Sequence, residues 1–262
     1  MAFVLIALAC YLGAALLAWQ RRAPLIAERG LAAMALILHG IALSGHIFRD
    51  GAITLGVNEA LSLFAWQSAV LLWGLCWREP LRALGVAVFP LAGLAAVSAI
   101  LWPTPINNGA PVADWKVRTH VVLSLFSAGL LTLAAVHASL LAAQERLLHG
   151  HRLTQFTRAL PPLQTMERLL FQLIGIGFLL LSLTLLSGLW FVRDWMAQHL
   201  AHKTVLSVSA WLIFGVLLWG RLRHGWRGRT AIRWTLAGYL TLILAYFGSK
   251  LILEQILGRH WS

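Results

Sequence analysis

Hydrophobic positions along the chain fall into eight long runs that short polar turns separate. Each run is about 20 residues long, enough for one α-helix to cross the roughly 30 Å hydrocarbon core of a bilayer. The pattern therefore predicts an all-α integral membrane protein with about eight transmembrane helices. We place the spans at residues 2–19, 31–48, 59–77, 83–102, 119–142, 168–191, 204–220 and 233–253.

The composition supports a membrane protein. Hydrophobic residues make up 60% of the chain, charged residues only 11%, and the mean hydropathy is +0.77. Soluble domains carry about 25% charged residues, so an ordinary soluble domain is excluded. The two cysteines, Cys10 and Cys76, are too few for a disulfide framework. We expect residues 1–262 to form a single polytopic domain with the lipid bilayer around it.

The positive charges predict the orientation of the chain. The turns after the first, third, fifth and seventh spans, together with the arginines that begin the next span, hold 14 of the 21 Lys and Arg residues. Because turns rich in Lys and Arg stay on the cytoplasmic side, both termini should lie outside. The same rule accounts for the net charge of +12, so we expect no nucleic-acid partner. The densest of these turns carries Arg221, Arg223, Arg227, Arg229 and Arg233.

Few acidic residues fall within the spans. Only Glu59 lies within a span and Glu254 directly borders one, and both are near the outer end of that span. Ion-coupled transporters need ionisable side chains deep in the membrane, which disfavours active transport. Histidines are the remaining candidates for chemistry.

Three histidines stand out by position. His39 lies in the middle of the second span, His120 begins the fifth, and His202 precedes the seventh beside Lys203. Imidazoles from different helices with basic residues nearby suit a haem, because iron takes axial nitrogens while cations pair with propionates. His137 lies about 26 Å from His120 along one helix and cannot share its metal. The alternative is that the histidines are structural, in a non-enzymatic subunit that stabilises or regulates another membrane complex.

Five segments carry a resemblance to a known family. They are THVVLSLFSAGLL from Thr119, MERLLFQLIGIGFLLLSLTLLSGLW from Met166, HKTVLSVSAWLIF from His202, GWRG at Gly225–Gly228 and YFG at Tyr246–Gly248. In this order and spacing the sequence resembles the cytochrome c assembly family, the haem-handling membrane proteins of the CcsA and CcmC type, most strongly over residues 115–250. The outer loop around Trp195 is shorter than the tryptophan-rich loop of full members. The chain is therefore more similar to the smaller YpjD-like and HemX-like branch.

The resemblance implies a function and a site. It implies a multi-pass protein of the bacterial inner membrane that binds haem b non-covalently and assists cytochrome c assembly or haem homeostasis. It implies no enzymatic activity, with haem and another inner-membrane protein as partners. His120 matches the family's outward haem-ligand histidine, and its axial partner is His39 or His202. Arg118 and Lys203 would pair with the propionates.

Overall fold

The computed structural model describes residues 2–20, 24–49, 52–53, 57–75, 82, 84–102, 115–149, 160–191 and 198–248. Within these ranges the chain forms eight α-helices, one two-stranded hairpin and a short π-helix. Its contacts divide the chain into two compact units: Met1–Pro111 with Arg146–Pro162 and Ser262, and Val112–Glu145 with Leu163–Trp261. The single polytopic domain stays a prediction.

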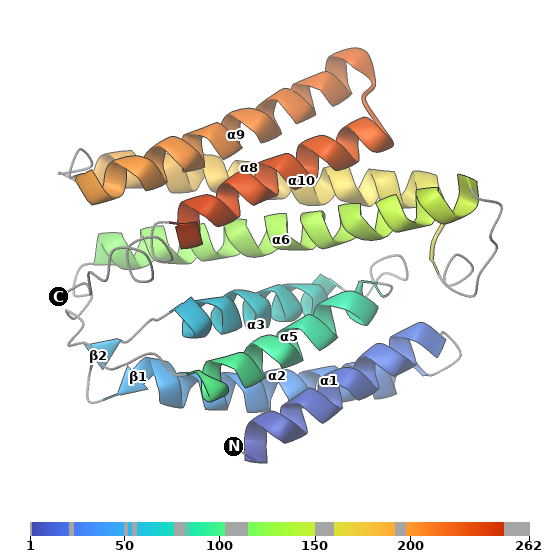
Figure 1. Ribbon diagram of the computed structural model, residues 1–262, viewed down its shortest axis with the longest axis vertical. Helices are drawn as coiled ribbons and strands as arrows, with labels where there is room; N and C mark the ends of the chain where they lie inside the picture. Colours follow the sequence, from blue (N-terminus) through green and yellow to red (C-terminus); the bar gives the residue numbers. More distant parts are fainter. Residues whose placement is uncertain are drawn as a thin grey trace. The chain divides into compact units, whose positions relative to one another are not determined.

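In its described residues, the first unit is a bundle of four helices (Figure 1). Helix α1 packs against α2 and α5, and α3 packs against α5 and α2. A small antiparallel hairpin follows α2, with Phe48 opposite Ile53. The elements are α1 (Ala2–Gln20), α2 (Leu25–Ile47), β1 (Phe48–Arg49), β2 (Ala52–Ile53), α3 (Val57–Leu75) and α5 (Gly85–Leu101).

The second unit is also helical. Helix α9 packs against α8 and α10, and the π-helix η1 continues α10 and touches α9. Residues of α6 after Glu145 group with the first unit. The elements are α6 (Trp115–His149), α8 (Leu163–Phe191), α9 (Gln198–His224), α10 (Arg229–Ile243) and η1 (Leu244–Gly248).

The structure confirms an all-α membrane protein. In the described part of the chain, α1, α2, α6, α8 and α9 are long and apolar enough to cross a membrane. Large apolar side chains also face outward along them. On α9, Val205, Leu212 and Trp219 recur every seven residues with exposed fractions of 64%, 52% and 60%. A repeat of seven residues keeps them on one helix face, as a lipid-facing surface requires.

Some helices extend beyond the predicted spans. Helix α2 begins at Leu25 rather than residue 31, and α6 continues to His149 rather than residue 142. Hydropathy detects only the part of a helix inside the hydrocarbon. Residues with high helix propensity, such as those of Ala27-Glu28-Arg29, continue the helix into the polar interface. The predicted last span overlaps α10 and η1 as far as Gly248, and its remainder lies outside the described residues.

Hydrogen bonds and small residues join α6 to α8. Ser127 Oγ donates to the Gly177 carbonyl over 3.2 Å, and His137 Nε2 donates to the Met166 carbonyl over 2.7 Å. A Cβ added at Gly177 would lie 2.8 Å from Leu131, so the absence of a side chain there allows the close approach. Small residues and interhelical hydrogen bonds of this kind hold helices together in lipid. His137 therefore has a packing role in the second unit.

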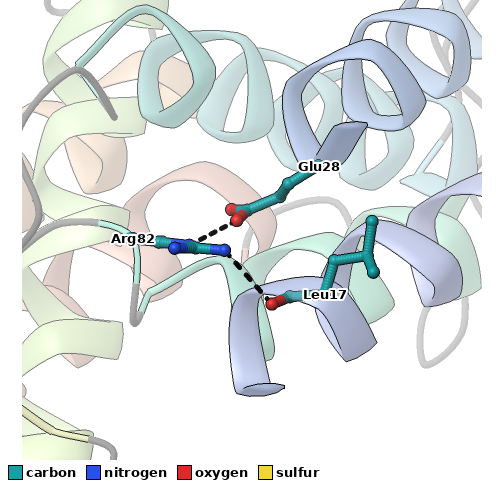
Figure 2. Close-up of polar contacts among 3 residues, drawn as sticks. All are labelled: Leu17, Glu28 and Arg82. Atoms are coloured by element: carbon teal, nitrogen blue, oxygen red, sulfur yellow. Dashed lines mark hydrogen bonds and ion pairs between the residues drawn. The ribbon is translucent and has the colours of Figure 1, made fainter. Parts of the chain in front are cut away.

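A buried ion pair links three segments of the first unit. Arg82 Nε lies 2.5 Å from Glu28 Oε2, and both side chains are almost fully buried (Figure 2). Arg82 also donates to the Leu17 carbonyl over 3.3 Å, in the last turn of α1. Glu28 lies in the first turn of α2, where the helix dipole favours a negative charge. Arg82 thus bridges the end of one helix and the beginning of the next.

This geometry predicts an asymmetric response to two substitutions. Glu28→Gln should destabilise the protein by about 3–5 kcal/mol, because it removes the carboxylate that pairs with the buried Arg82 charge. Arg229→Gln, which breaks a 4.0 Å pair of a 65% exposed side chain with Glu145, should change stability by about 0–1 kcal/mol. Thermal unfolding of both variants in detergent checks this. Equal shifts in melting temperature would contradict it.

The orientation predicted from the charge distribution is tested separately. Alkaline phosphatase fused after Gly228 should be inactive because that turn is predicted to be cytoplasmic. The same reporter fused at Gln198, at the other end of α9, should be active. Activity at Gly228 with silence at Gln198 would reverse the orientation of every span.

Candidate functional site

A cavity of about 420 Å³ lies in the second unit, between α6, α8, α9 and η1. Most of its wall is aliphatic, with leucines from α8 forming one side. Polar groups reach it from α6 and from the first turns of α9. Its described lining includes His120, Ser124, Leu181, Thr184, Leu185, Leu189, Lys203, Thr204, Ser207, Val208 and Tyr246.

His120 is held by a relay of two hydrogen bonds. Its Nδ1 lies 2.9 Å from Ser187 Oγ, and Ser187 Oγ donates its own hydrogen to the Thr184 carbonyl, also over 2.9 Å. Because the serine hydrogen is used by Thr184, Ser187 accepts the hydrogen bond and His120 Nδ1 carries the proton. The lone pair of the neutral ring is then on Nε2. This is the arrangement that orients a histidine as a metal ligand.

Gly188 gives the imidazole its room. A Cβ added there would lie 3.1 Å from His120 Cε1 and 3.7 Å from Nδ1. Any larger residue at this point of α8 would push the ring away from Ser187. The Ser187-Gly188 pair therefore supplies both a hydrogen-bond acceptor and a flat surface for the ring.

Lys203 brings the charge to the cavity. It lies in the second turn of α9 and is the one charged side chain among the described lining residues. Two lining hydroxyls are engaged with their own helices, since Ser124 Oγ donates to the Val121 carbonyl and Thr184 Oγ1 to the Leu180 carbonyl, each over 2.8 Å. The imidazole and the ammonium group therefore dominate the polar chemistry of an otherwise apolar cavity.

The π-helix η1 forms another side of the cavity. Ala245 and Tyr246 line it, and the Tyr246 hydroxyl donates to the Ser124 carbonyl over 3.4 Å. A π-turn has one more residue than an α-turn and often occurs at functional sites. Here it places an aromatic residue from the end of α10 against α6.

Two predicted site residues lie close to this cavity in sequence. Arg118 is on α6, two residues before His120, and His202 is on α9, directly before Lys203. Their backbone is helical, while their side chains lie outside the described residues. The structure therefore brings His120 and Lys203 to one cavity, and the roles of Arg118 and His202 stay predictions.

His39 lies in the first unit and is only 1% exposed. Its Nδ1 is 3.2 Å from the Tyr11 hydroxyl and its Nε2 is 2.8 Å from Ser62 Oγ. The Tyr11 ring also meets the imidazole edge-on at a centroid distance of 5.9 Å. Both nitrogens of His39 thus have protein partners, so binding iron would require breaking a buried hydrogen bond.

The sequence alone did not predict a site role for Ser187, Gly188 or Thr184, and it named Tyr246 only as part of the YFG segment. The available signal was weak: two small residues, Ser187 and Gly188, near the end of an apolar run. Their level relative to His120 depends on how α8 is aligned against α6, and that alignment is set by tertiary contacts such as Ser127 with Gly177.

Comparisons with known proteins place the chain among membrane proteins. It is 34% identical to the inner membrane protein YpjD of Escherichia coli strain K12 over 244 residues, covering 91% of this chain and 89% of that protein. It is 22% identical to the cytochrome c biogenesis protein CcsA of Picosynechococcus over 264 residues, with 78% of each chain covered. It is 26% identical to protein HemX of Brevibacillus brevis over 155 residues, 58% of this chain and 57% of that protein. No solved structure matches the chain significantly.

The sequence profile of the cytochrome C assembly protein family matches residues 2–257, nearly the whole chain. Together with the apolar helices and the similarity to YpjD, this confirms a multi-pass protein of the inner membrane. The chain belongs to the cytochrome c assembly protein family.

Proposed function

We propose that this protein binds haem b non-covalently in the cavity of its second unit, with His120 as an axial ligand. Family membership supports a role in cytochrome c biogenesis or haem handling. The observation that carries the proposal is the Thr184–Ser187–His120 relay, which leaves the lone pair on Nε2 of a histidine that lines the cavity. When bound, haem supplies the redox and axial-ligand chemistry of its iron.

The cavity suits this cofactor in size and lining. Its 420 Å³ lies within the range of about 300–1,000 Å³ that small-molecule sites occupy. Aliphatic side chains from α8 match an apolar macrocycle, and Lys203 offers a cation for a propionate. Arg118 lies in the first turn of α6, two residues before His120, and is the second cation that we assign to the propionates. These residues bind and orient the cofactor, which is what a protein contributes to such a site.

The second axial ligand that we favour is His202. It precedes Lys203 on α9, so it belongs to a segment that already reaches the cavity. His39 is the weaker candidate because Tyr11 and Ser62 engage both of its nitrogens in the first unit. Its contacts support a structural role in the bundle of α1, α2 and α3.

The proposal makes the protein a carrier of haem rather than an enzyme. The outer loop between α8 and α9 is short, so little chain is available to present haem to an apocytochrome. We therefore assign it to holding haem for cytochrome c assembly or haem homeostasis, next to another inner-membrane protein. The alternative function, a subunit that stabilises or regulates another membrane complex, is favoured by the structural roles of His39 and His137.

The absorption spectrum of the purified protein tests the haem site. Wild type should show a Soret band, and His120→Ala should abolish or shift it, because alanine leaves the axial position without nitrogen. His202→Ala should behave in the same way. His39→Ala should keep the wild-type spectrum and lower only the melting temperature, and His137→Ala serves as a second control that is too far along α6 to reach the iron.

Two results would overturn the proposal. One is a wild-type protein that purifies colourless and takes up no added haem. The other is His120→Ala binding haem as wild type does. Either result makes the regulatory-subunit alternative the better explanation. A His39→Ala variant that loses the Soret band while His202→Ala keeps it would instead move the second ligand to the first unit.

Ser187 provides a sharper test of the relay. Ser187→Ala removes the acceptor for His120 Nδ1–H, and loss of such a supporting contact weakens metal binding by about 10–100-fold. Ser187→Thr keeps the hydroxyl and should restore most of the affinity. Haem titration in detergent, read at the Soret maximum, measures both. Equal affinity of wild type and Ser187→Ala would show that the relay does not position the ligand.

A further inference from the structure

The turn between α9 and α10 has a well-defined shape. Gly225 and Gly228 have φ of +65° and +56°, where residues with a side chain are strained. Between them, the Trp226 N–H donates to the Gly220 carbonyl over 3.2 Å. The Trp226 ring lies directly against Gly220, where a Cβ would overlap with it. The turn thus folds a tryptophan back over the end of α9.

Aromatic rings continue from this tryptophan along the turn. Trp219 and His224 are 5.2 Å apart between ring centroids, His224 and Trp226 are 6.4 Å apart, and Trp226 and Trp234 are 5.5 Å apart. Trp219 is 60% exposed and the neighbouring Leu222 is 87% exposed. Tryptophans gather where hydrocarbon meets headgroups, so this end of the two helices lies at the membrane interface.

Some of the cations of this turn serve the fold. Arg221 Nη1 donates to the Trp226 carbonyl over 3.1 Å, and its guanidinium lies over the Phe171 ring at 4.7 Å. Arg229 Nε lies 4.0 Å from Glu145, and Glu167 accepts a 2.8 Å hydrogen bond from the Gly228 N–H. The two carboxylates near the turn are therefore already engaged with Arg229 and Gly228.

Arg223, Arg227 and Arg233 differ from Arg221 and Arg229 in having no such partner among the described residues. All three are exposed, and in the described part of the chain none makes an ion pair or side-chain hydrogen bond. Arg223 follows Leu222 on α9, four residues after Trp219, while Arg227 lies in the turn and Arg233 on α10. We call these three arginines with Trp219 and Leu222 the α9–α10 basic surface. It combines guanidinium groups, which bind phosphate with two parallel hydrogen bonds, with side chains that enter hydrocarbon.

We propose that the α9–α10 basic surface is a binding site for the headgroup of an anionic phospholipid. The phosphodiester is bound by the three arginines, and the acyl chains lie against Leu222 and Trp219. A soluble polyanion would leave these apolar side chains in water, whereas a lipid covers them. A zwitterionic headgroup carries a positive charge that opposes the arginines, so the site discriminates phosphatidylglycerol from phosphatidylcholine.

Native mass spectrometry of the full chain in detergent tests this site. Wild type, titrated with dioleoylphosphatidylglycerol or dioleoylphosphatidylcholine, should retain the anionic lipid with at least about tenfold preference, as expected for several arginines at a membrane surface. The triple variant Arg223→Gln, Arg227→Gln, Arg233→Gln should bind both lipids equally. Three arginines outside this surface, substituted as Arg21→Gln, Arg22→Gln, Arg146→Gln, are the control with the same net charge and should keep the preference.

Three outcomes would overturn the proposal. The first is a basic-surface variant that keeps the wild-type preference, and the second is a control variant that loses it to the same extent. The third is suppression of lipid binding by millimolar inorganic phosphate, which would assign the arginines to a soluble anion. If the triple variant fails to fold, the three single substitutions replace it, and each should lower the preference. Arg227→Lys then separates guanidinium recognition from charge alone, since lysine keeps the charge without the planar fork.

Discussion

Inside a bilayer, every backbone N–H and C=O must find a partner within the protein, because no water is present to replace one. Helices meet this requirement within themselves, so association between helices depends on close packing and on a few side-chain hydrogen bonds. In the first unit, a Cβ at Gly93 would lie 2.7 Å from Leu8, which shows how closely α5 approaches α1. In the second unit, Gly177 plays the same part between α8 and α6. Small residues therefore allow the close approach of the helices, and that approach determines which polar side chains can reach one another.

The same constraint distinguishes His39 from His120. A neutral imidazole has one donor and one acceptor, and a buried ring needs both satisfied. His39 meets this need inside the bundle, with Tyr11 and Ser62 on its two nitrogens. Among the described residues, the side-chain partner of His120 is Ser187 on Nδ1, and the histidine lines a cavity. The number of protein partners separates a packing histidine from a candidate ligand.

The sequence predicted the helices well because their signal is local. A run of about 20 apolar residues identifies a membrane span wherever it lies in the chain, and each predicted span overlaps a helix. It also placed His120 and Lys203 at corresponding ends of two spans. The sequence could not reveal Ser187 or Gly188 as site residues, because their contact with His120 depends on how α8 is aligned against α6. It could not separate His39 from His120 either, since partners such as Tyr11 lie 28 residues away in the chain.

Helix α9 connects the two surfaces to which we assign binding. Lys203 lies at the cavity and His224 at the α9–α10 turn, 21 residues later, which corresponds to about 32 Å at 1.5 Å per residue. That length matches the roughly 30 Å thickness of the hydrocarbon core, so we expect the two proposed sites to lie at opposite interfaces. A count of charges treats all the arginines of the turn as equivalent, but their contacts differ. Arg221 and the hydrogen bond from the Gly228 N–H to Glu167 hold the turn together, and that fixed turn presents Arg223, Arg227 and Arg233 outward.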